Sequence, residues 1–207
     1  MNDRSVFHLI ADLTKQEGVS CILIGGFAIN HYQVSHHTGD IDFLITKDDF
    51  HKIEPLLKKA GYSQSGSHEN FAQFKSSKLS LMAVDFMFVD EETLVKIKKE
   101  AKEIKIAGQK LFVPSLNHLI ALKLHSIKNN PKLRLIKDFP DIVGLIKINN
   151  VNVISNTGSI GCVIIRAVDF DIRLFSKSYH ENIWNKVCFD TMMFSIFFST
   201  ASRVEIT

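Results

Sequence analysis

Two spacings of apolar residues run through the first part of the chain and predict two kinds of element. The apolar positions that lie three or four residues apart, as in an amphipathic helix, are Val6, Leu9, Ile10 and Leu13, and this helix should end at Gly18. Unbroken apolar runs at residues 21–24 and 43–45 are instead typical of buried strands. Residues 27–33 return to helical spacing, so the predicted order is helix, strand, short helix, strand.

Similar patterns continue to residue 113. Thr46 can cap a helix over residues 47–60, which has acidic side chains in its first turn and lysines in its last. The further segments predicted are a polar loop at 63–70, strands at 71–75 and 79–89 that pair with each other, a helix at 91–99, and a hairpin of strands at 102–106 and 110–113. The fold class is therefore α+β or α/β, with a small mixed β-sheet flanked by helices.

Two more helices are predicted after the hairpin. Ser115 is the expected cap of the first, which ends before Pro131, and its apolar stripe consists of Leu116, Leu119, Ile120, Leu124 and Ile127. The second covers residues 133–148. It should restart at Pro140, because the residue before a proline disfavours the helical region of backbone space.

These patterns divide the chain into three parts. Residues 1–113 form a core, residues 114–150 form a helical segment that completes the site, and residues 151–207 form an atypical tail. The tail has fewer charges and more aromatic residues than the rest, and its periodicity is broken. It is either a small accessory subdomain that shapes an acceptor pocket or a tail altered by a reading-frame change.

The candidate chemistry begins at the first of the two apolar runs. Gly25 and Gly26 close that run, and fourteen residues after Gly26 the segment Asp40-Ile41-Asp42 opens the second run. Side chains two apart on a strand share one face, so the two carboxylates lie about 7 Å apart along the chain and can hold a divalent cation. A Gly-Gly turn at a helix start lets backbone N–H groups approach a phosphate. Metal and phosphate would then share one cleft.

A third acid is expected on a later strand. Asp85 is the only charged residue within the strongly β-prone run at 79–89, and a buried carboxylate needs a partner. It is therefore predicted as the third metal ligand, the alternative being an outward position on a half-exposed strand. Asp169 and Asp171 repeat the Asp-x-Asp spacing without a preceding Gly-Gly pair, so we interpret them as a chance match.

These features resemble the polymerase β-like nucleotidyltransferase superfamily, whose signature is Gly-Gly or Gly-Ser, then Asp-x-Asp on the next strand and a later third acid. Residues 24–28 and 38–44 look most like the AbiEii-like branch of abortive-infection toxins and their relatives. That branch commonly shows Arg-x-Thr-x-Asp-Ile-Asp, and His36 stands here at the arginine position. The resemblance places His36 and Thr38 with Gly25 and Gly26 in the nucleotide-binding set.

The same resemblance extends to the two later helices. A lysine and a Lys-Asp pair belong to the site of that branch, and the matching residues are Lys123, Lys137 and Asp138. Both lysines would face nucleotide phosphates, while Asp138 would orient a lysine or the substrate hydroxyl. For Asp141, a solvated Lys and Asp face with support between residues four apart is an equally good interpretation.

The resemblance implies an enzyme that moves an NMP from an NTP to a hydroxyl acceptor. Two Mg²⁺ ions, or Mn²⁺ in their place, would be held by Asp40, Asp42 and Asp85. The acceptor is left open among a tRNA end, a protein side chain and a small molecule, and a cognate antitoxin is an implied partner. The alternative is a nucleotide-binding regulatory protein without turnover. His31, His36 and His37 lack zinc-type spacing, so magnesium with oxygen ligands is favoured over zinc.

Composition adds limits to this picture. The chain has 207 residues, 45% of them hydrophobic, enough to bury a core. Its formal charge of +3 permits a polyanionic partner without requiring one. No apolar run is long enough to span a bilayer, and three cysteines without metal spacing favour a reducing, cytoplasmic location. Nothing in the sequence decides the oligomeric state.

Overall fold

The computed structural model describes residues 5–78 and 81–151, and these divide into two compact units. The first unit consists of the chain up to His31 together with Ser35–Ser115, and the second unites Tyr32–Val34 with the chain from Leu116 onward. The first unit contains α1 (Val6–Glu17), β1 (Ile22–Ile24), α2 (Gly25–His31), β2 (Asp40–Thr46), α3 (Lys47–Lys59), β3 (Tyr62–His68), β4 (Phe71–Ser76), β5 (Ala83–Val89), α4 (Glu91–Lys99), β6 (Lys102–Ile106) and β7 (Gln109–Val113).

A five-stranded mixed sheet organises the first unit, with the strand order β1-β2-β5-β4-β3. The two central strands, β2 and β5, run parallel, whereas the remaining pairs are antiparallel. Because β2 and β5 are parallel, their connection must cross the sheet, and α3 with the β3–β4 hairpin provides it. This crossover brings β2 and β5 into direct register, with Asp42 opposite Asp85, 43 residues later in the sequence.

One face of this sheet is a closed hydrophobic core. The side chains that point into it are fully buried, with at most 2% exposure, and they are Leu23, Ile41, Phe43, Ile45, Ala72, Phe74, Val84 and Phe86. Phe50 from α3 covers this face, and its ring centroid lies 5.2 Å from that of Phe86 and 4.9 Å from that of Phe88. The alternation that buries these residues necessarily turns Asp40, Asp42 and Asp85 to the opposite face.

Local signals account for the helix boundaries. The Thr46 hydroxyl accepts a hydrogen bond from the Asp49 backbone N–H at 3.2 Å, and the Asp90 carboxylate accepts one from Thr93 at 2.8 Å, so both side chains cap a helix. Gly18 ends α1 in the left-handed conformation. The β6–β7 hairpin forms a separate two-stranded sheet and lies beside α1 in both ribbon views.

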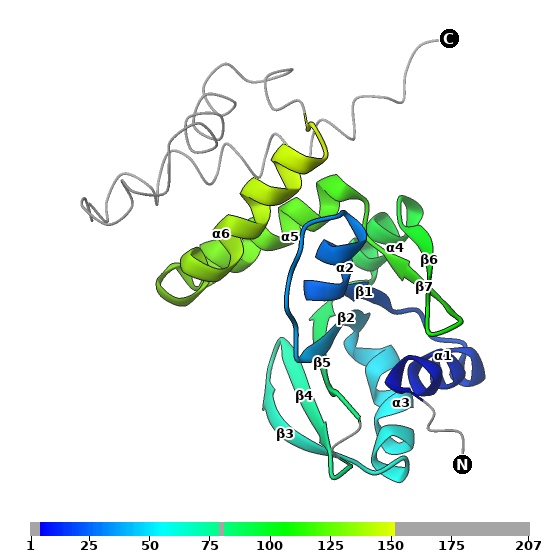
Figure 1. The fold of residues 1–207 in the computed structure, drawn as a ribbon. Coiled ribbons are helices and arrows are strands. Elements are labelled where there is room, and N and C mark those ends of the chain that lie inside the picture. Colours follow the sequence, from blue (N-terminus) through cyan, green and yellow to red (C-terminus); the bar gives the residue numbers. More distant parts are fainter. Residues whose placement is uncertain (1–4, 79–80, 152–207) are drawn as a thin grey trace. The chain divides into compact units, whose positions relative to one another are not determined.

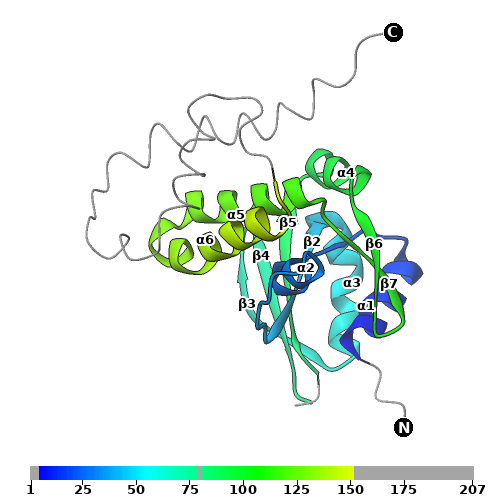
Figure 2. The same ribbon diagram turned by 45° about the horizontal axis from the view of Figure 1, so that its top comes forward.

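The second unit is built on two antiparallel helices, α5 (Leu116–Asn129) and α6 (Pro131–Ile148), which lie side by side in Figures 1 and 2. Tyr32–Val34 packs with them. The Asn149 side-chain amide donates to the Tyr32 carbonyl at 3.0 Å, and a Cβ on Gly144 would come within 2.9 Å of Val34. The chain segment between α2 and β2 is therefore tied into this helical pair.

Two sequence predictions about these elements were wrong, and one helix begins earlier than expected. Residues 63–68 are not a loop, because β3 pairs with β4, with one register shift between Gln64 and Gly66, and an edge strand can be polar when its neighbour supplies the hydrogen bonds. Of the predicted loop, only Glu69 and Asn70 form a turn. Pro131 lies beyond the end of α5, as predicted, and it also starts α6 two residues before the expected start at Leu133, at a position where its missing N–H costs nothing. The helix does not restart at Pro140, because α6 continues through this exposed residue as a single helix.

The remaining elements in the described range match the sequence predictions in type. The expected strand at 79–89 is seen from Ala83 onward, and it pairs with β4 as predicted. No helix in the described residues is long and apolar enough to cross a membrane. The tail from residue 152, including the Asp169 and Asp171 pair, lies outside the described residues.

Candidate metal centre on the open face of the sheet

Three carboxylates gather on the face of the sheet opposite the core. Asp40 and Asp42 come from the start of β2, and Asp85 comes from the middle of β5 directly beside Asp42. One carboxylate oxygen from each residue lies within 4.8 Å of the other two, and all three side chains are half-buried. Between them Ile41 is fully buried on the other side, so the pleat of β2 holds both of its carboxylates in place.

The chemistry of this donor set fits a hard divalent cation. Three carboxylates provide anionic oxygen ligands, which magnesium and manganese accept, and no histidine or cysteine belongs to the group. It is the one cluster of metal-ligating side chains found in residues 5–78 and 81–151. The residues that the sequence selected as metal ligands are thus brought together, and a zinc-type cluster is not formed by His31, His36 or His37.

Gly25 and Gly26 lie next to this cluster, and steric crowding explains why each position holds glycine. Gly25 has φ +63°, and a Cβ there would overlap the Asp42 Oδ2 and lie 2.6 Å from its Cγ. A Cβ on Gly26 would lie 2.6 Å from the Thr38 Cβ and 2.8 Å from the His36 ring. Glycine is therefore required for packing at both positions, independently of any phosphate.

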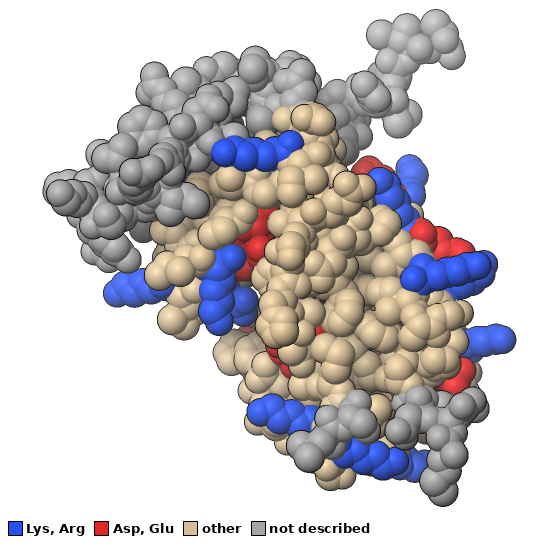
Figure 3. Space-filling model, viewed as in Figure 1, with Lys and Arg blue, Asp and Glu red and all other residues tan. Residues whose placement is uncertain are grey.

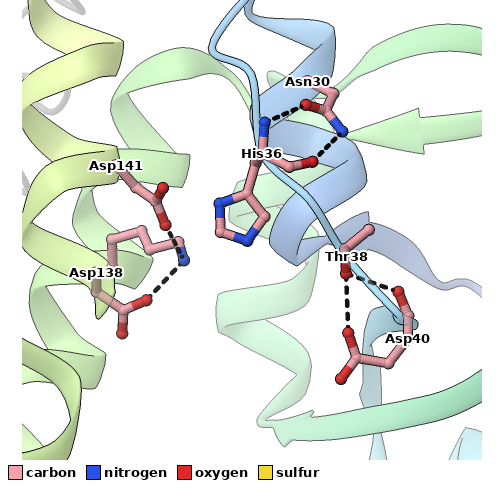
Figure 4. Close-up of polar contacts among 7 residues, drawn as sticks. Asn30, His36, Thr38, Asp40, Asp138 and Asp141 are labelled. Atoms are coloured by element: carbon pink, nitrogen blue, oxygen red, sulfur yellow. Dashed lines mark hydrogen bonds and ion pairs between the residues drawn. The ribbon is translucent and has the colours of Figure 1, made fainter. Parts of the chain in front are cut away.

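Thr38 and His36 lie on the segment that enters β2, and Thr38 contacts Asp40 of the cluster (Figure 4). The Thr38 hydroxyl lies 2.9 Å from the Asp40 Oδ1 and 3.0 Å from the Asp40 carbonyl, and it donates its hydrogen toward them. Asn30 in α2 bonds both backbone groups of His36, accepting from its N–H at 2.8 Å and donating to its carbonyl at 2.9 Å. Asn30 thus fixes the backbone at His36, and Thr38 orients the first carboxylate.

Gln73 is a site residue that the sequence interpretation missed. It lies opposite Asp85 on β4, and its side-chain amide donates to the Asp85 Oδ2 at 2.7 Å. The signal was present in the alternation of residues 72–74, where Ala72 and Phe74 face the core and the residue between them must face the acids. Gln73 therefore orients the Asp85 carboxylate.

In the second unit, Lys123 forms a buried ion-pair network with two acids. Its Nζ lies 2.7 Å from the Asp138 Oδ1 and 2.9 Å from the Asp141 Oδ2. Both aspartates are buried, with 3% and 6% exposure, so the interpretation of a solvated face at Asp141 is wrong. The Asp138 Oδ2 is buried and has no hydrogen-bond partner among the described residues.

Lys137 differs from its neighbour Asp138. It is exposed on α6, whereas Asp138 turns toward α5 and meets Lys123. The expectation that Asp138 orients a lysine agrees with this contact, since the lysine concerned is Lys123. The roles of Lys123, Lys137 and Asp138 in nucleotide binding stay predictions.

Basic side chains do not form one continuous patch on the face drawn in Figure 3. The Lys and Arg side chains of the described residues stand there in several separate places, interrupted by uncharged surface. Charge alone therefore selects no polyanionic partner on that face, and the carboxylate cluster carries the functional argument.

Comparison with solved structures decides the fold. ANT(2")-Ia in complex with adenylyl-2"-tobramycin aligns with a TM-score of 0.54 at 14% identity, over 79% of this chain and 95% of that chain. An antigenic nucleotidyltransferase-like protein from Paracoccidioides brasiliensis aligns with a TM-score of 0.51 at 17% identity, over 83% and 88% of the two chains. This chain has the nucleotidyltransferase fold. The predicted fold class is thereby confirmed.

The solution structure of the antibiotic-resistance factor ANT(2'')-Ia shares the nucleotidyltransferase fold as well, with a TM-score of 0.51 at 15% identity, over 70% of this chain and 86% of that chain. No family model and no curated protein matches the sequence. At these identities the likeness establishes the nucleotidyltransferase fold, and the activity has to be argued from the site.

Proposed function

We propose that the chain is a metal-dependent nucleotidyltransferase that moves an NMP from an NTP to a hydroxyl acceptor. The observation that carries this proposal is the convergence of Asp40, Asp42 and Asp85 within 4.8 Å on one sheet face of a nucleotidyltransferase fold. Two strands supply the three acids, so the arrangement does not depend on a flexible loop. The membership of the AbiEii-like branch and a toxin–antitoxin role are part of the hypothesis.

In the proposed reaction, the acceptor oxygen forms a bond to the α-phosphorus of the NTP. The bond from that phosphorus to the bridging oxygen breaks, so pyrophosphate leaves, and the hydroxyl proton passes to Asp85 or to water. Magnesium, when bound, would supply charge stabilisation and a more acidic acceptor hydroxyl. Asp40 and Asp42 would hold the cation on the triphosphate, and Thr38 and Gln73 would keep two of the carboxylates oriented.

Gly25 and Gly26 would receive the triphosphate through their backbone N–H groups, with His36, Lys123 and Lys137 as further candidate phosphate contacts. ANT(2")-Ia was solved with an adenylylated antibiotic, which supports a small-molecule acceptor as one class here. A tRNA end and a protein side chain remain the other acceptor classes in the proposal. The alternative function is nucleotide binding without turnover, in a regulatory protein.

The metal ligands are tested by Asp40→Asn and Asp42→Asn. Each should abolish transfer of a labelled α-phosphate to total tRNA, total protein or tobramycin. The fold should survive, because losing one charge relieves repulsion among three carboxylates in the absence of metal, so thermal melts of the apo variants should be at least as high as wild type. Asp48→Asn, an exposed acid in the first turn of α3, is the matched control. Near-normal transfer by either variant at saturating magnesium would refute the assigned metal site.

A substitution at Asp85 distinguishes the transferase hypothesis from the hypothesis of nucleotide binding without turnover. Asp85→Ala should keep measurable affinity for the NTP, because Asp40, Asp42 and the glycine turn remain, while transfer falls by orders of magnitude. Unchanged activity would remove Asp85 from the site. If the wild-type chain binds NTP with magnesium yet labels no acceptor in these screens, the non-catalytic alternative is favoured.

A further inference from the structure

A second row of side chains lies next to the carboxylates on the same sheet face. His68 on β3, Phe71 on β4 and Met87 on β5 are cross-strand neighbours, with His68 opposite Phe71 and Phe71 opposite Met87. The His68 and Phe71 rings stack, with centroids 5.7 Å apart and planes 18° apart. We refer to His68, Phe71 and Met87 as the ring platform.

The platform shares its face with the acids because of strand alternation. Met87 follows Asp85 by two residues on β5, and Phe71 precedes Gln73 by two residues on β4, so each pair points the same way. The separation along either strand is about 7 Å. A molecule lying on the platform therefore has Asp85 within reach of a group attached to one edge of it.

Two side chains of the platform, Phe71 and Met87, are exposed to solvent. Leu44, the next residue of the same row on β2, is 1% exposed, whereas Phe71 is 37% and Met87 is 40% exposed. Single exposed apolar residues are ordinary, but a paired aromatic and thioether surface beside a candidate catalytic cluster is typical of a binding surface. The three platform side chains therefore offer stacking and apolar contact beside the carboxylates of the cluster.

The end of the cluster away from the platform lies next to the glycine turn. Gly25, Gly26 and Thr38 adjoin Asp40 and Asp42, where the proposed function places the triphosphate. Asp85 lies on the β4 side of the cluster, held by Gln73, and the platform extends from that side. The two ends of the site therefore offer different chemistry, phosphate contacts at one and aromatic and thioether side chains at the other.

We propose that the ring platform is the acceptor subsite and that it takes an acceptor whose hydroxyl is attached to, or one group away from, a planar aromatic ring. This inference rests on the proposed function. The ring stacks on Phe71 and Met87, and its hydroxyl reaches Asp85. A planar ring gains from contact with both the aromatic face and the polarisable Met87 sulfur, whereas a puckered polycationic sugar gains from neither to the same extent.

The test uses the full chain with ¹³C-methyl methionine, observed by NMR in the presence of magnesium and a non-hydrolysable ATP analogue that occupies the nucleotide end. The chain contains five methionines, and Met87→Leu identifies the Met87 signal. Adenosine and tyrosine amide are the ring-bearing probes, which separate a nucleoside from a phenolic acceptor, and tobramycin is the ring-less probe. Ring-current shifts of the Met87 methyl group are expected with one or both ring-bearing probes and not with tobramycin.

Phe71→Ala should weaken binding of the ring-bearing probe about tenfold, in line with the usual contribution of stacking on an aromatic side chain, and Phe71→Tyr should restore it. Phe112→Ala is the matched control, since Phe112 has 38% exposure and lies in the separate β6–β7 sheet. The inference is overturned if neither ring-bearing probe shifts the Met87 methyl signal, if tobramycin shifts it more strongly, or if Phe112→Ala weakens binding as much as Phe71→Ala.

Binding of magnesium with ATP, measured separately by calorimetry, distinguishes this failure from failure of the proposed function. If ATP binds and no ring does, the platform assignment falls while the transferase assignment stands. If rings shift Met87 and ATP with magnesium does not bind, the transferase assignment falls, and with it the acceptor role of the platform.

Discussion

Gly25 shows how one residue connects backbone geometry to the candidate chemistry. Its left-handed φ of +63° already favours glycine, and the space where a side chain would start is filled by the carboxylate of Asp42. Gly18 has nearly the same φ, +64°, but nothing within 4 Å of its Cβ position. A comparison of Gly25 with Gly18 therefore distinguishes the effect of backbone strain from the effect of crowding at the site.

Gly25→Ala should lower the free energy of unfolding by more than Gly18→Ala, whose cost is the left-handed strain of about 1–3 kcal/mol. The extra cost arises because Asp42 must move to admit the methyl group, so magnesium affinity should fall in Gly25→Ala and stay unchanged in Gly18→Ala. Urea unfolding and metal titration measure the two effects. Equal losses of stability and unaltered metal binding in both variants would contradict the crowding argument.

Lys123 is a residue of the second unit whose loss should lower stability strongly. Its ammonium group pairs with the buried carboxylates of Asp138 and Asp141, so Lys123→Met removes a cationic partner from both. We expect a loss of about 3–5 kcal/mol in the free energy of unfolding. The control is Lys58→Met, which breaks the exposed pair with Glu54 and should cost no more than about 1 kcal/mol. A Lys123→Met variant as stable as Lys58→Met would show that the network contributes little to folding.

At the scale of elements, helix ends and strand edges decide most of the local structure. Asp90 accepts hydrogen bonds from both the backbone and the hydroxyl of Thr93, and these bonds lower its pKa below the usual value. Pro140 is tolerated inside α6 on an exposed face, and the polar β3 strand exists because β4 pairs with it. The start of α4 and the edge strand β3 therefore depend on specific hydrogen bonds, and single substitutions can test these bonds.

The Asp90 cap predicts a pH-dependent contribution to stability. Because the pKa of Asp90 is lower in the folded chain than in the unfolded chain, its stabilisation is complete at neutral pH and is lost as the pH falls through the folded-state pKa. Asp90→Ala should therefore melt at a lower temperature than wild type at pH 7, and the difference should shrink in acid. Thermal melts across this range provide the measurement. A difference that is constant with pH would show that the charge of Asp90 is not involved.

At the scale of the whole molecule, every residue placed at the carboxylate cluster comes from the first unit. Asp40, Asp42, Asp85 and Gln73 all belong to the five-stranded sheet, and Gly25 adjoins it. The helices α5 and α6 form their own unit around the Lys123 network. The three carboxylates of the candidate metal centre are therefore all supplied by the first unit.

A chain that ends at Asn150 should accordingly still bind an NTP with magnesium. The measurement is nucleotide affinity by calorimetry, with circular dichroism to show that the shortened chain is folded. Full-length protein carrying Asp42→Asn serves as the control for binding that does not depend on the metal centre. If the shortened chain is folded and has no nucleotide affinity, the tail contributes to the pocket.

The sequence alone determined the features that depend on neighbouring residues. Alternation along β2 places Asp40 and Asp42 on one face, apolar spacing defines α1, and the Thr46 cap marks the start of α3. Asp85 was recognisable as the lone charge of an apolar strand. These inferences succeed because side-chain direction within one strand or helix follows from its period. The mixed sheet flanked by helices followed from the same patterns.

Only the tertiary structure decided which residues meet across elements. The parallel register of β2 and β5 sets Asp85 beside Asp42, the β4 register brings Gln73 to Asp85, and the pairing of α5 with α6 buries Lys123 between two acids. Strand pairing and helix packing join residues far apart in sequence, and no local period specifies their alignment. For the same reason the polar segment at 62–68 forms β3. The strand is specified by backbone pairing with β4, and the composition of the segment itself does not indicate a strand.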